Sequence, residues 1–138
     1  MNTGNGQSQQ MTMDPATPTA SVLVVERSPA IQRLFEVVLR DVADPLIIVA
    51  DHERAGELLA TEPIDVAVLE PQGRSELHWE LLDDLQAAAI PAIVVTSRID
   101  EQVEAEAIRR GAAGFLTKPF MPAALQTIIR DIIRADNV

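Results

Sequence analysis

The chain has no cysteine and a single lysine among its 138 residues. The absence of cysteine excludes a disulfide scaffold, a zinc knuckle, an iron–sulfur cluster and a thiol nucleophile, and it favours a reducing compartment. No apolar run approaches the roughly 18 residues that a membrane span requires, and the polar N-terminus lacks the regions of a signal peptide. We therefore expect a cytoplasmic protein that does not contact membranes.

Basic residues are scarce. The 11 lysines and arginines are outnumbered by 21 acidic residues, which gives a formal net charge of −10. A field of this sign repels phosphate backbones, so direct nucleic-acid binding is not expected. The chain also lacks a glycine-rich phosphate loop, and His52 and His78 have no metal-ligand spacing. These absences argue against a nucleotide-binding protein and against a zinc-dependent one, and we expect no bound cofactor.

The chain divides into a tail and one domain. Residues 1–20 are rich in Gly, Asn, Gln, Thr and Pro without apolar periodicity, which predicts a disordered tail. From residue 21 to about 135, short β-branched runs alternate with longer amphipathic stretches, and residues 136–138 form the C-terminal end. The chain stops just after the last expected helix, so we expect a stand-alone domain without an output domain.

Five short apolar runs are the expected strands: 22–25, 46–50, 66–69, 92–95 and 114–116. Nearly continuous apolar strands are typical of a parallel sheet that helices cover on both faces. The expected helices begin after Ser28 as N-cap, span about 53–60, carry Leu77, Leu81, Leu82 and Leu85, run from Asp100 to Arg110, and begin near Pro122. Gly111 is expected just past the fourth helix, as a C′ residue. The pattern predicts an α/β fold, a three-layer (βα)5 doubly wound parallel five-stranded sheet.

In such a sheet, reactive groups collect at the carboxyl ends of the strands. The residues just past the strands are Glu26, Arg27, Glu70, Thr96, Ser97, Thr117 and Lys118. Lys118 is the most informative because every other basic position except the histidines is arginine. A compact ammonium suits a point contact with a carboxylate or phosphoryl oxygen in a confined pocket. The alternative is a lysine retained by chance on a loop.

These residues, together with the segments SVLVVERSPAIQRLFEVVL, IDVAVLEPQ, AIVVTS and GAAGFLTKPF, resemble the receiver domain of two-component response regulators. The resemblance covers residues 21 to about 135 and implies a flavodoxin-like fold in bacterial phosphorelay signalling. In that family an acid pair after the first strand helps to hold magnesium, and an aspartate after the third strand accepts the phosphoryl group. The resemblance assigns phosphoryl contacts to Thr96 and Lys118 and the aromatic switch position to Phe115.

The acidic positions depart from the family pattern. Glu26 replaces the first acid, Arg27 stands where the second acid is expected, and Glu70 stands at the phosphoacceptor position. Gly73 and Arg74 take the place of the usual Met-Pro, and His78 that of a glycine. With Glu26 and Glu70 opposed by Arg27 and Lys118, the formal pocket charge is zero without a metal. Two like unit charges about 4 Å apart repel by roughly 4 kcal/mol at an effective dielectric near 20, so we expect neither magnesium binding nor phosphorylation.

The resulting hypothesis is a pseudo-receiver, not an enzyme, in which Glu70 pairs with Lys118 or Arg27 and the conformation is fixed. We favour a constitutively active conformation, although Glu70 carries about one negative charge and an acyl phosphate nearly two. One alternative is a decayed pocket on a fold kept as a scaffold. The other is a still-active phosphoacceptor that uses Mg²⁺ and a histidine kinase.

The fifth helix suggests a contact surface. Its apolar residues span about 180° of the helix, wider than the roughly 100° stripe that packing on a sheet needs; they are Ala124, Leu125, Ile128, Ile129, Ile132 and Ile133. We expect a homodimer, or docking of a kinase or downstream effector, through the fourth helix, fifth strand and fifth helix. The alternative is a deep core without a partner. Trp79 is expected to pack or to lie at a rim.

Overall fold

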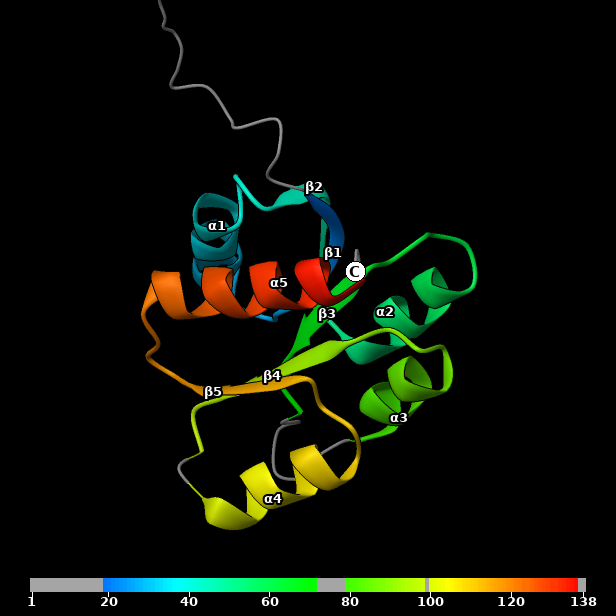
Figure 1. Ribbon diagram of the computed structural model, residues 1–138, viewed down its shortest axis with the longest axis vertical. Coiled ribbons are helices and arrows are strands. Elements are labelled where there is room, and N and C mark those ends of the chain that lie inside the picture. Colours follow the sequence, from blue (N-terminus) through cyan, green and yellow to red (C-terminus); the bar gives the residue numbers. More distant parts are fainter. Residues whose placement is uncertain (1–18, 72–78, 99, 137–138) are drawn as a thin grey trace, which may run out of the picture.

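The computed structural model describes residues 19–71, 79–98 and 100–136. In this part of the chain five strands alternate with five helices (Figure 1). The strands are β1 (Ala20–Val25), β2 (Ala43–Val49), β3 (Val66–Leu69), β4 (Ala92–Thr96) and β5 (Gly114–Thr117). The helices are α1 (Pro29–Val38), α2 (His52–Leu59), α3 (Glu80–Ala87), α4 (Glu101–Arg109) and α5 (Pro122–Asp136). The predicted (βα)5 order is confirmed.

All neighbouring strands pair in parallel, in the order β2-β1-β3-β4-β5. The chain therefore winds outward in both directions from the central pair β1 and β3. Val25 pairs with Leu69 at the ends of these two strands, so the residues that follow them emerge side by side. Ligands of this sheet class bind where the winding direction changes, outside the carboxyl ends of the strands.

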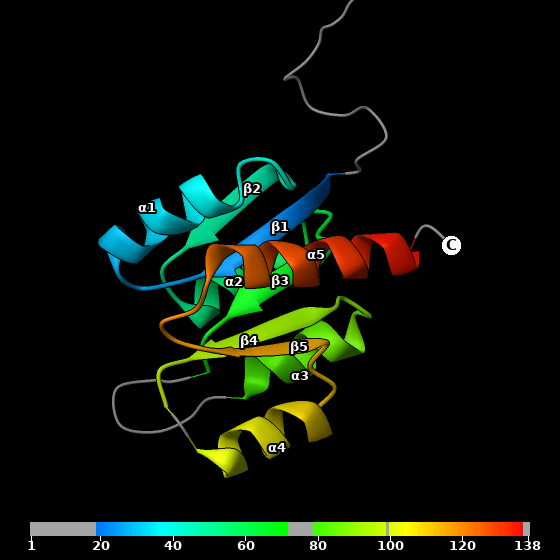
Figure 2. The same ribbon diagram turned by 60° about the vertical axis from the view of Figure 1, so that its left-hand side comes forward.

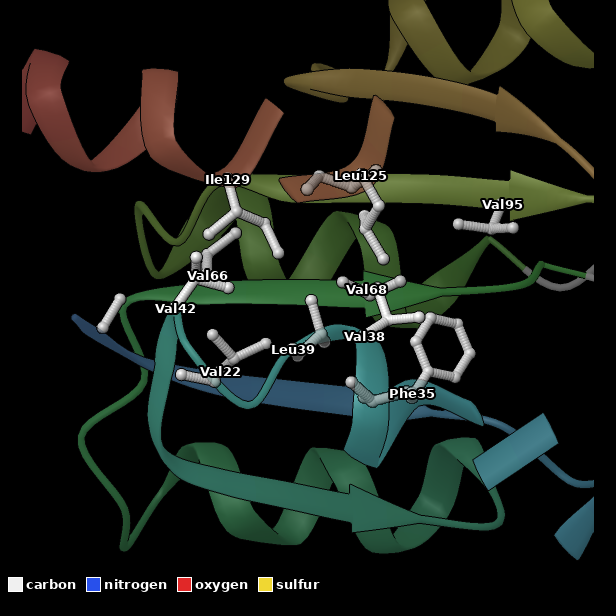
Figure 3. Packing of buried hydrophobic residues seen from close by; sticks show 14 of the residues in the cluster. Val22, Phe35, Val38, Leu39, Val42, Val66, Val68, Val95, Leu125 and Ile129 are labelled. Atoms are coloured by element: carbon white, nitrogen blue, oxygen red, sulfur yellow. The ribbon is translucent and has the colours of Figure 1, made fainter. Parts of the chain in front are cut away.

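Two apolar cores flank the sheet. Figures 1 and 2 show from two sides the helices that cover its two faces. Because successive side chains of a strand point to opposite faces, Val22 and Val24 pack under α1 and α5, whereas Leu23 and Val25 pack under α2, α3 and α4. Figure 3 shows the first of these cores, in which Phe35 and Val38 of α1 and Leu125 and Ile129 of α5 pack on the same face of the sheet. The predicted three-layer arrangement is confirmed.

The helices differ in how firmly this packing anchors them. α5 buries Leu125, Ile129 and Ile133, and α3 buries three leucines, whereas α4 buries only Val103 and Ala107. Full burial of a large aliphatic side chain contributes about 1.5–3 kcal/mol. Helices α1 and α2 also bury only two residues each, but theirs include a phenylalanine and a leucine, so the valine and alanine of α4 are the smallest buried apolar set among the described helices.

Two strands begin two or more residues earlier than the sequence predicts, and both shifts have local causes. β2 begins at Ala43 and includes Asp44 and Pro45, residues that argue against a strand interior. The sheet order places β2 at an edge, where a proline and a charged side chain are tolerated. β1 likewise begins at Ala20, whose N–H donates to the carbonyl of Val42, so the domain starts within the segment predicted as tail.

The helix starts follow the capping residues of the sequence. Ser28 Oγ accepts a hydrogen bond from the N–H of Ile31 at 3.4 Å, and Pro29 occupies the first turn of α1. Asp51 and Asp100 cap α2 and α4 in the same way. α3 begins at Glu80 after Trp79, without a side-chain cap. Leu77 of the expected third helix lies outside the described residues, as do residues 1–18 of the expected tail.

The C-terminus of α4 confirms the predicted role of Gly111. Its φ is +92°, and its N–H and that of Ala112 donate to the carbonyls of Ile108 and Ala107. This is a Schellman motif, which needs a left-handed residue at C′. None of the described helices is long and apolar enough to span a membrane.

Candidate functional site

The residues predicted to converge do meet at the carboxyl edge of the sheet. Glu26 directly follows β1 and Glu70 directly follows β3, on either side of the point where the winding direction changes. Thr96 is the last residue of β4, one residue later than the predicted strand end. Lys118 directly follows β5. The sheet thus brings together side chains up to 92 positions apart in the chain.

Lys118 joins the two carboxylates. Its Nζ donates to Oε1 of Glu26 at 2.9 Å and to Oε1 of Glu70 at 3.1 Å. The side chains of Glu26, Lys118 and Glu70 are 7%, 21% and 23% exposed, so the cluster is largely removed from water. Charge-assisted hydrogen bonds of this kind are about twice as strong as neutral ones. We call these three residues the Lys118 cluster.

The cluster keeps Lys118 protonated. Burial lowers the pKa of Lys118, but the hydrogen bonds that it donates to Glu26 and Glu70, together with their negative charges, raise it by more, so the net shift is upward. The ammonium is therefore charged throughout the physiological range. With two carboxylates and one ammonium, the formal charge of the Lys118 cluster is −1.

Arg27 does not join the cluster, which corrects the charge balance predicted from the sequence. Its side chain is exposed, and it forms no ion pair with any residue that the structure describes. Successive residues of an extended chain point in opposite directions, so Glu26 enters the pocket and Arg27 turns to solvent. The sequence allowed Glu70 to form an ion pair with Lys118 or with Arg27, and in the structure its ion pair is with Lys118. The expected direct repulsion between Arg27 and a cation is correspondingly weaker, because water screens an exposed charge.

Thr96 ties the ends of β4 and β5 together. It is completely buried, its carbonyl accepts from the N–H of Lys118 at 2.8 Å, and its Oγ1 accepts from the N–H of Arg98 at 3.0 Å. Ser97, the next residue, is exposed. These backbone links fix the position from which the Lys118 side chain starts.

Phe115 lies in β5 opposite Val94 of β4, partly buried, and packs on the core under α2, α3 and α4. It belongs to the edge strand that Lys118 directly follows, but it does not enter the Lys118 cluster. The structure therefore places the predicted switch position on the side of α4.

Two residues that the sequence analysis missed hold the backbone of the acidic positions. Gln32 of α1 donates from Nε2 to the carbonyl of Glu26 at 2.7 Å, and Nε2 of His52 lies 2.9 Å from the carbonyl of Glu70. One helix on each side of the sheet thus supports one of the two acids. The position of His52 at the start of the helix after β2 is the signal that could have indicated this role. His78, Gly73 and Arg74 lie outside the described residues.

The donor set does not suit a divalent cation. Both acidic side chains already accept hydrogen bonds from Lys118, and Oε2 of Glu26 also accepts from the N–H of Ser28 at 3.1 Å. Among the described residues, no three His, Cys, Asp or Glu side chains gather closely enough to hold a metal ion. A magnesium ion needs several free oxygen ligands in near-octahedral geometry. The residues present therefore do not fit the metal that the family resemblance implies.

Comparisons with known proteins agree on one family. The model of the response regulator receiver domain matches residues 22–130. The regulatory protein VirG of Rhizobium rhizogenes is 29% identical over 115 residues, which cover 82% of this chain and 48% of that protein. The probable transcriptional regulator ycf27 of Porphyridium aerugineum is 25% identical over 114 residues, again 82% of this chain and 48% of the relative. The chain spans about half the length of these relatives.

Solved structures share the fold. The Francisella response regulator 1452 receiver domain superimposes with a TM-score of 0.72 at 20% identity, covering 86% of this chain and 99% of the other. The chemotaxis response regulator CheY4 of Vibrio cholerae gives a TM-score of 0.71 at 23% identity, covering 83% and 98%. The flavodoxin-like fold expected from the sequence is confirmed.

Proposed function

Because the chain belongs to the response regulator receiver family, we propose that it is an atypical receiver, which signals through protein–protein contact without phosphorylation of an aspartate. In this proposal the internal ion pairs of the Lys118 cluster take the place of magnesium and a phosphoryl group. The protein is then a signalling module in a two-component system and not an enzyme.

The observation that carries the proposal is the position of Lys118 Nζ between Glu26 and Glu70. A cation that used these carboxylates would have to displace the ammonium from both of them. The exposed Arg27 supplies no ligand in place of the second acid of the family. Phosphoryl transfer depends on a cation to neutralise the developing charge, so losing that cation removes the main source of rate acceleration.

We further propose that the Lys118 cluster holds the receiver in an active-like conformation. The family resemblance implies that Lys118 contacts the phosphoryl group. In this chain the Glu70 carboxylate stands in for that group, with its Oε1 3.1 Å from Lys118 Nζ. A carboxylate supplies about one negative charge where an acyl phosphate supplies nearly two, so the mimicry is partial. A pocket that has decayed on a retained scaffold is the alternative, and it predicts no partner-binding difference when Glu70 is changed.

The proposed contact surface comprises α4, β5 and α5. Ile108 of α4 is 59% exposed and Met121, just before α5, is 73% exposed, while Ile128 and Ile132 of α5 remain partly exposed. The core therefore buries only part of the wide apolar face predicted for α5. We propose that this surface binds a second copy of the chain or a signalling partner, either a kinase or a downstream effector.

The proposal is tested by measuring the intact mass of the protein after incubation with acetyl phosphate and magnesium. We expect no gain of a phosphoryl group, because the cluster lacks a metal-binding donor set. The double variant Arg27→Asp/Glu70→Asp serves as control, since it restores the family's acid residues and should gain magnesium affinity. A phosphorylated wild-type protein would contradict the proposal and establish the other reading, an active phosphoacceptor that uses Mg²⁺ and a histidine kinase.

A further inference from the structure

Arg110 connects the end of α4 to the face of α3. Its guanidinium forms ion pairs with Asp83 of α3 at 2.6 Å and with Glu106 of α4 at 2.5 Å. It also lies over the ring of Trp79, 5.5 Å from the centroid. The side chains of Arg110 and Glu106 are 27% and 28% exposed, so their ion pair is partly shielded from water, whereas Asp83 is 52% exposed. A cation–π contact together with two directed ion pairs suits the several fixed donors of a guanidinium better than the single ammonium of lysine.

The contacts share one face of α3. Trp79, Asp83 and Gln86 follow one another at intervals of four and three residues, which places them along one side of a helix. A Cβ added to Gly111 would lie 2.5 Å from Oε1 of Gln86, so the chain immediately after Arg110 also runs close against α3. The whole C-terminal end of α4 is therefore seated on α3.

The contacts of Arg110 with α3 matter because α4 buries little apolar surface. Only Val103 and Ala107 of α4 are buried, and the helix lies at the periphery of the molecule (Figures 1 and 2). Elements with few buried apolar contacts open first in local unfolding. A polar anchor at one end then controls how often the helix leaves its position.

We infer that Arg110 is a latch that fixes α4 on α3 and thereby holds the surface of α4, β5 and α5 in one arrangement, whatever occupies the pocket. The functional consequence rests on the proposed function, because that surface is the proposed contact site. The latch itself rests only on the contacts of Arg110. It joins two helices on the same side of the sheet without involving the Lys118 cluster.

Arg109 provides a matched control. It has the same chemistry, is adjacent in the chain and also pairs with Glu106, but it is 68% exposed and has no ion pair to α3 among the described residues. Asp83 and Asp84 form a second matched pair on α3, because Arg110 reaches only Asp83 in the described contacts.

The test is amide hydrogen exchange of α4, compared with α5 as an internal reference. Arg110→Ala should speed exchange in α4 by about five- to thirtyfold, the range that corresponds to a moderate loss of local stability, while α5 keeps its rates. Arg109→Ala should leave both helices unchanged. Asp83→Asn should reproduce the effect in a milder form and Asp84→Asn should not, which keeps the test decisive if Arg110→Ala folds poorly.

Equal exchange rates in α4 for Arg110→Ala and Arg109→Ala would overturn the latch. So would a rise of exchange in α4 and α5 together, because that pattern reports global destabilisation. Trp79 emission gives a second readout: it should shift in Arg110→Ala and not in Arg109→Ala. The intact-mass experiment does not depend on α4, so phosphorylation of the wild-type protein would defeat the proposed function and leave the latch standing.

Discussion

At the scale of single residues, the central feature is one ammonium between two carboxylates. Glu26 is the more buried acid, and it depends on Lys118 for charge compensation. Removing one partner of a buried ion pair leaves the other charge without compensation, and this usually costs more than the intact pair contributes. The three residues of the Lys118 cluster are therefore expected to respond unequally to substitution.

Lys118→Met keeps most of the aliphatic stem and removes the charge. We expect it to lower the free energy of unfolding by about 2 kcal/mol at neutral pH, because Glu26 is left buried beside a second carboxylate. Glu70→Gln should cost about 1 kcal/mol or less, since Lys118 retains Glu26 and the amide still accepts a hydrogen bond. Urea denaturation measures both values. A Glu70→Gln variant less stable than Lys118→Met would contradict this order.

The cluster also predicts a pH dependence. Burial lowers the pKa of Lys118 and the two carboxylates raise it by more, so its pKa in the folded protein lies above the ordinary 10.5. A group whose folded pKa is raised stabilises fully below the unfolded pKa and loses that contribution as the pH rises through the folded value. The stability difference between wild type and Lys118→Met should therefore be constant in the mildly alkaline range and shrink above pH 10.5. A difference that disappears below that pH would show that Lys118 is not held as an ammonium.

The sequence predicted which residues meet at the site better than it predicted the net charge of the site. Glu26, Glu70 and Lys118 were placed together because each follows a parallel strand, and strand ends of one sheet meet at one edge. Arg27 was counted with them because sequence position does not reveal which of two adjacent side chains turns inward. The position of His52 at the start of the helix after β2 indicates a contact at this edge of the sheet, but its particular partner, the Glu70 carbonyl, depends on how α2 packs on the sheet.

At the scale of secondary-structure elements, the ends of α3 and α4 form a natural comparison. Both close with the same Schellman pattern, in which the N–H groups of Ala89 and Ile90 mirror those of Gly111 and Ala112. The residue in the left-handed position is Ala89, with φ +58°, in one case and Gly111 in the other. A left-handed conformation costs an L-residue roughly 1–2 kcal/mol, so alanine is strained where glycine is not.

The two positions should therefore respond in opposite directions. Ala89→Gly should raise the free energy of unfolding by about 0.5–1 kcal/mol, the relief of strain being offset in part by the greater entropy of glycine in the unfolded chain. Gly111→Ala should lower it by more than about 1 kcal/mol, because strain adds to a close approach to Gln86. Thermal unfolding of the two variants measures this. Two changes of the same sign would contradict the motif assignment.

Element order was predictable and element boundaries were less so. The five apolar runs were long enough to mark every strand of the described sheet, and Gly111 marked the end of α4. β2 was placed too late because Asp44 and Pro45 lower strand propensity, and only the sheet order shows that β2 is an edge strand that tolerates them.

At the scale of the whole molecule, the proposed contact surface predicts association. Ile133 lies on the apolar side of α5 but is buried, so a charge there would disrupt the core. Ile108 is the better probe, because it is exposed on α4. If the protein forms a dimer through α4, β5 and α5, Ile108→Asp should shift it to the mass of a single chain in analytical ultracentrifugation. Val37→Asp, at a 62% exposed position of α1 and so outside the three elements of the proposed surface, is the control and should leave the dimer intact.

If the wild-type protein sediments as a single chain, the homodimer hypothesis is rejected. Docking of a different partner then remains as the proposed function of this surface. If Val37→Asp dissociates the dimer and Ile108→Asp does not, the interface lies on α1. The overall charge of −10 makes a partner with a basic face the electrostatically favoured one.

The central claim is that the ion pairs of Lys118 with Glu26 and Glu70 already take the place of the metal and the phosphoryl group. Because the chain contains one lysine, lysine-selective ¹⁵N labelling gives a single Nζ signal that reports on this group alone. Its NMR resonance should stay unchanged when magnesium and beryllofluoride are added, whereas the Arg27→Asp/Glu70→Asp variant should respond. A saturable shift of the Lys118 signal in the wild-type protein would show that the pocket still accepts both ligands, and it would contradict the account.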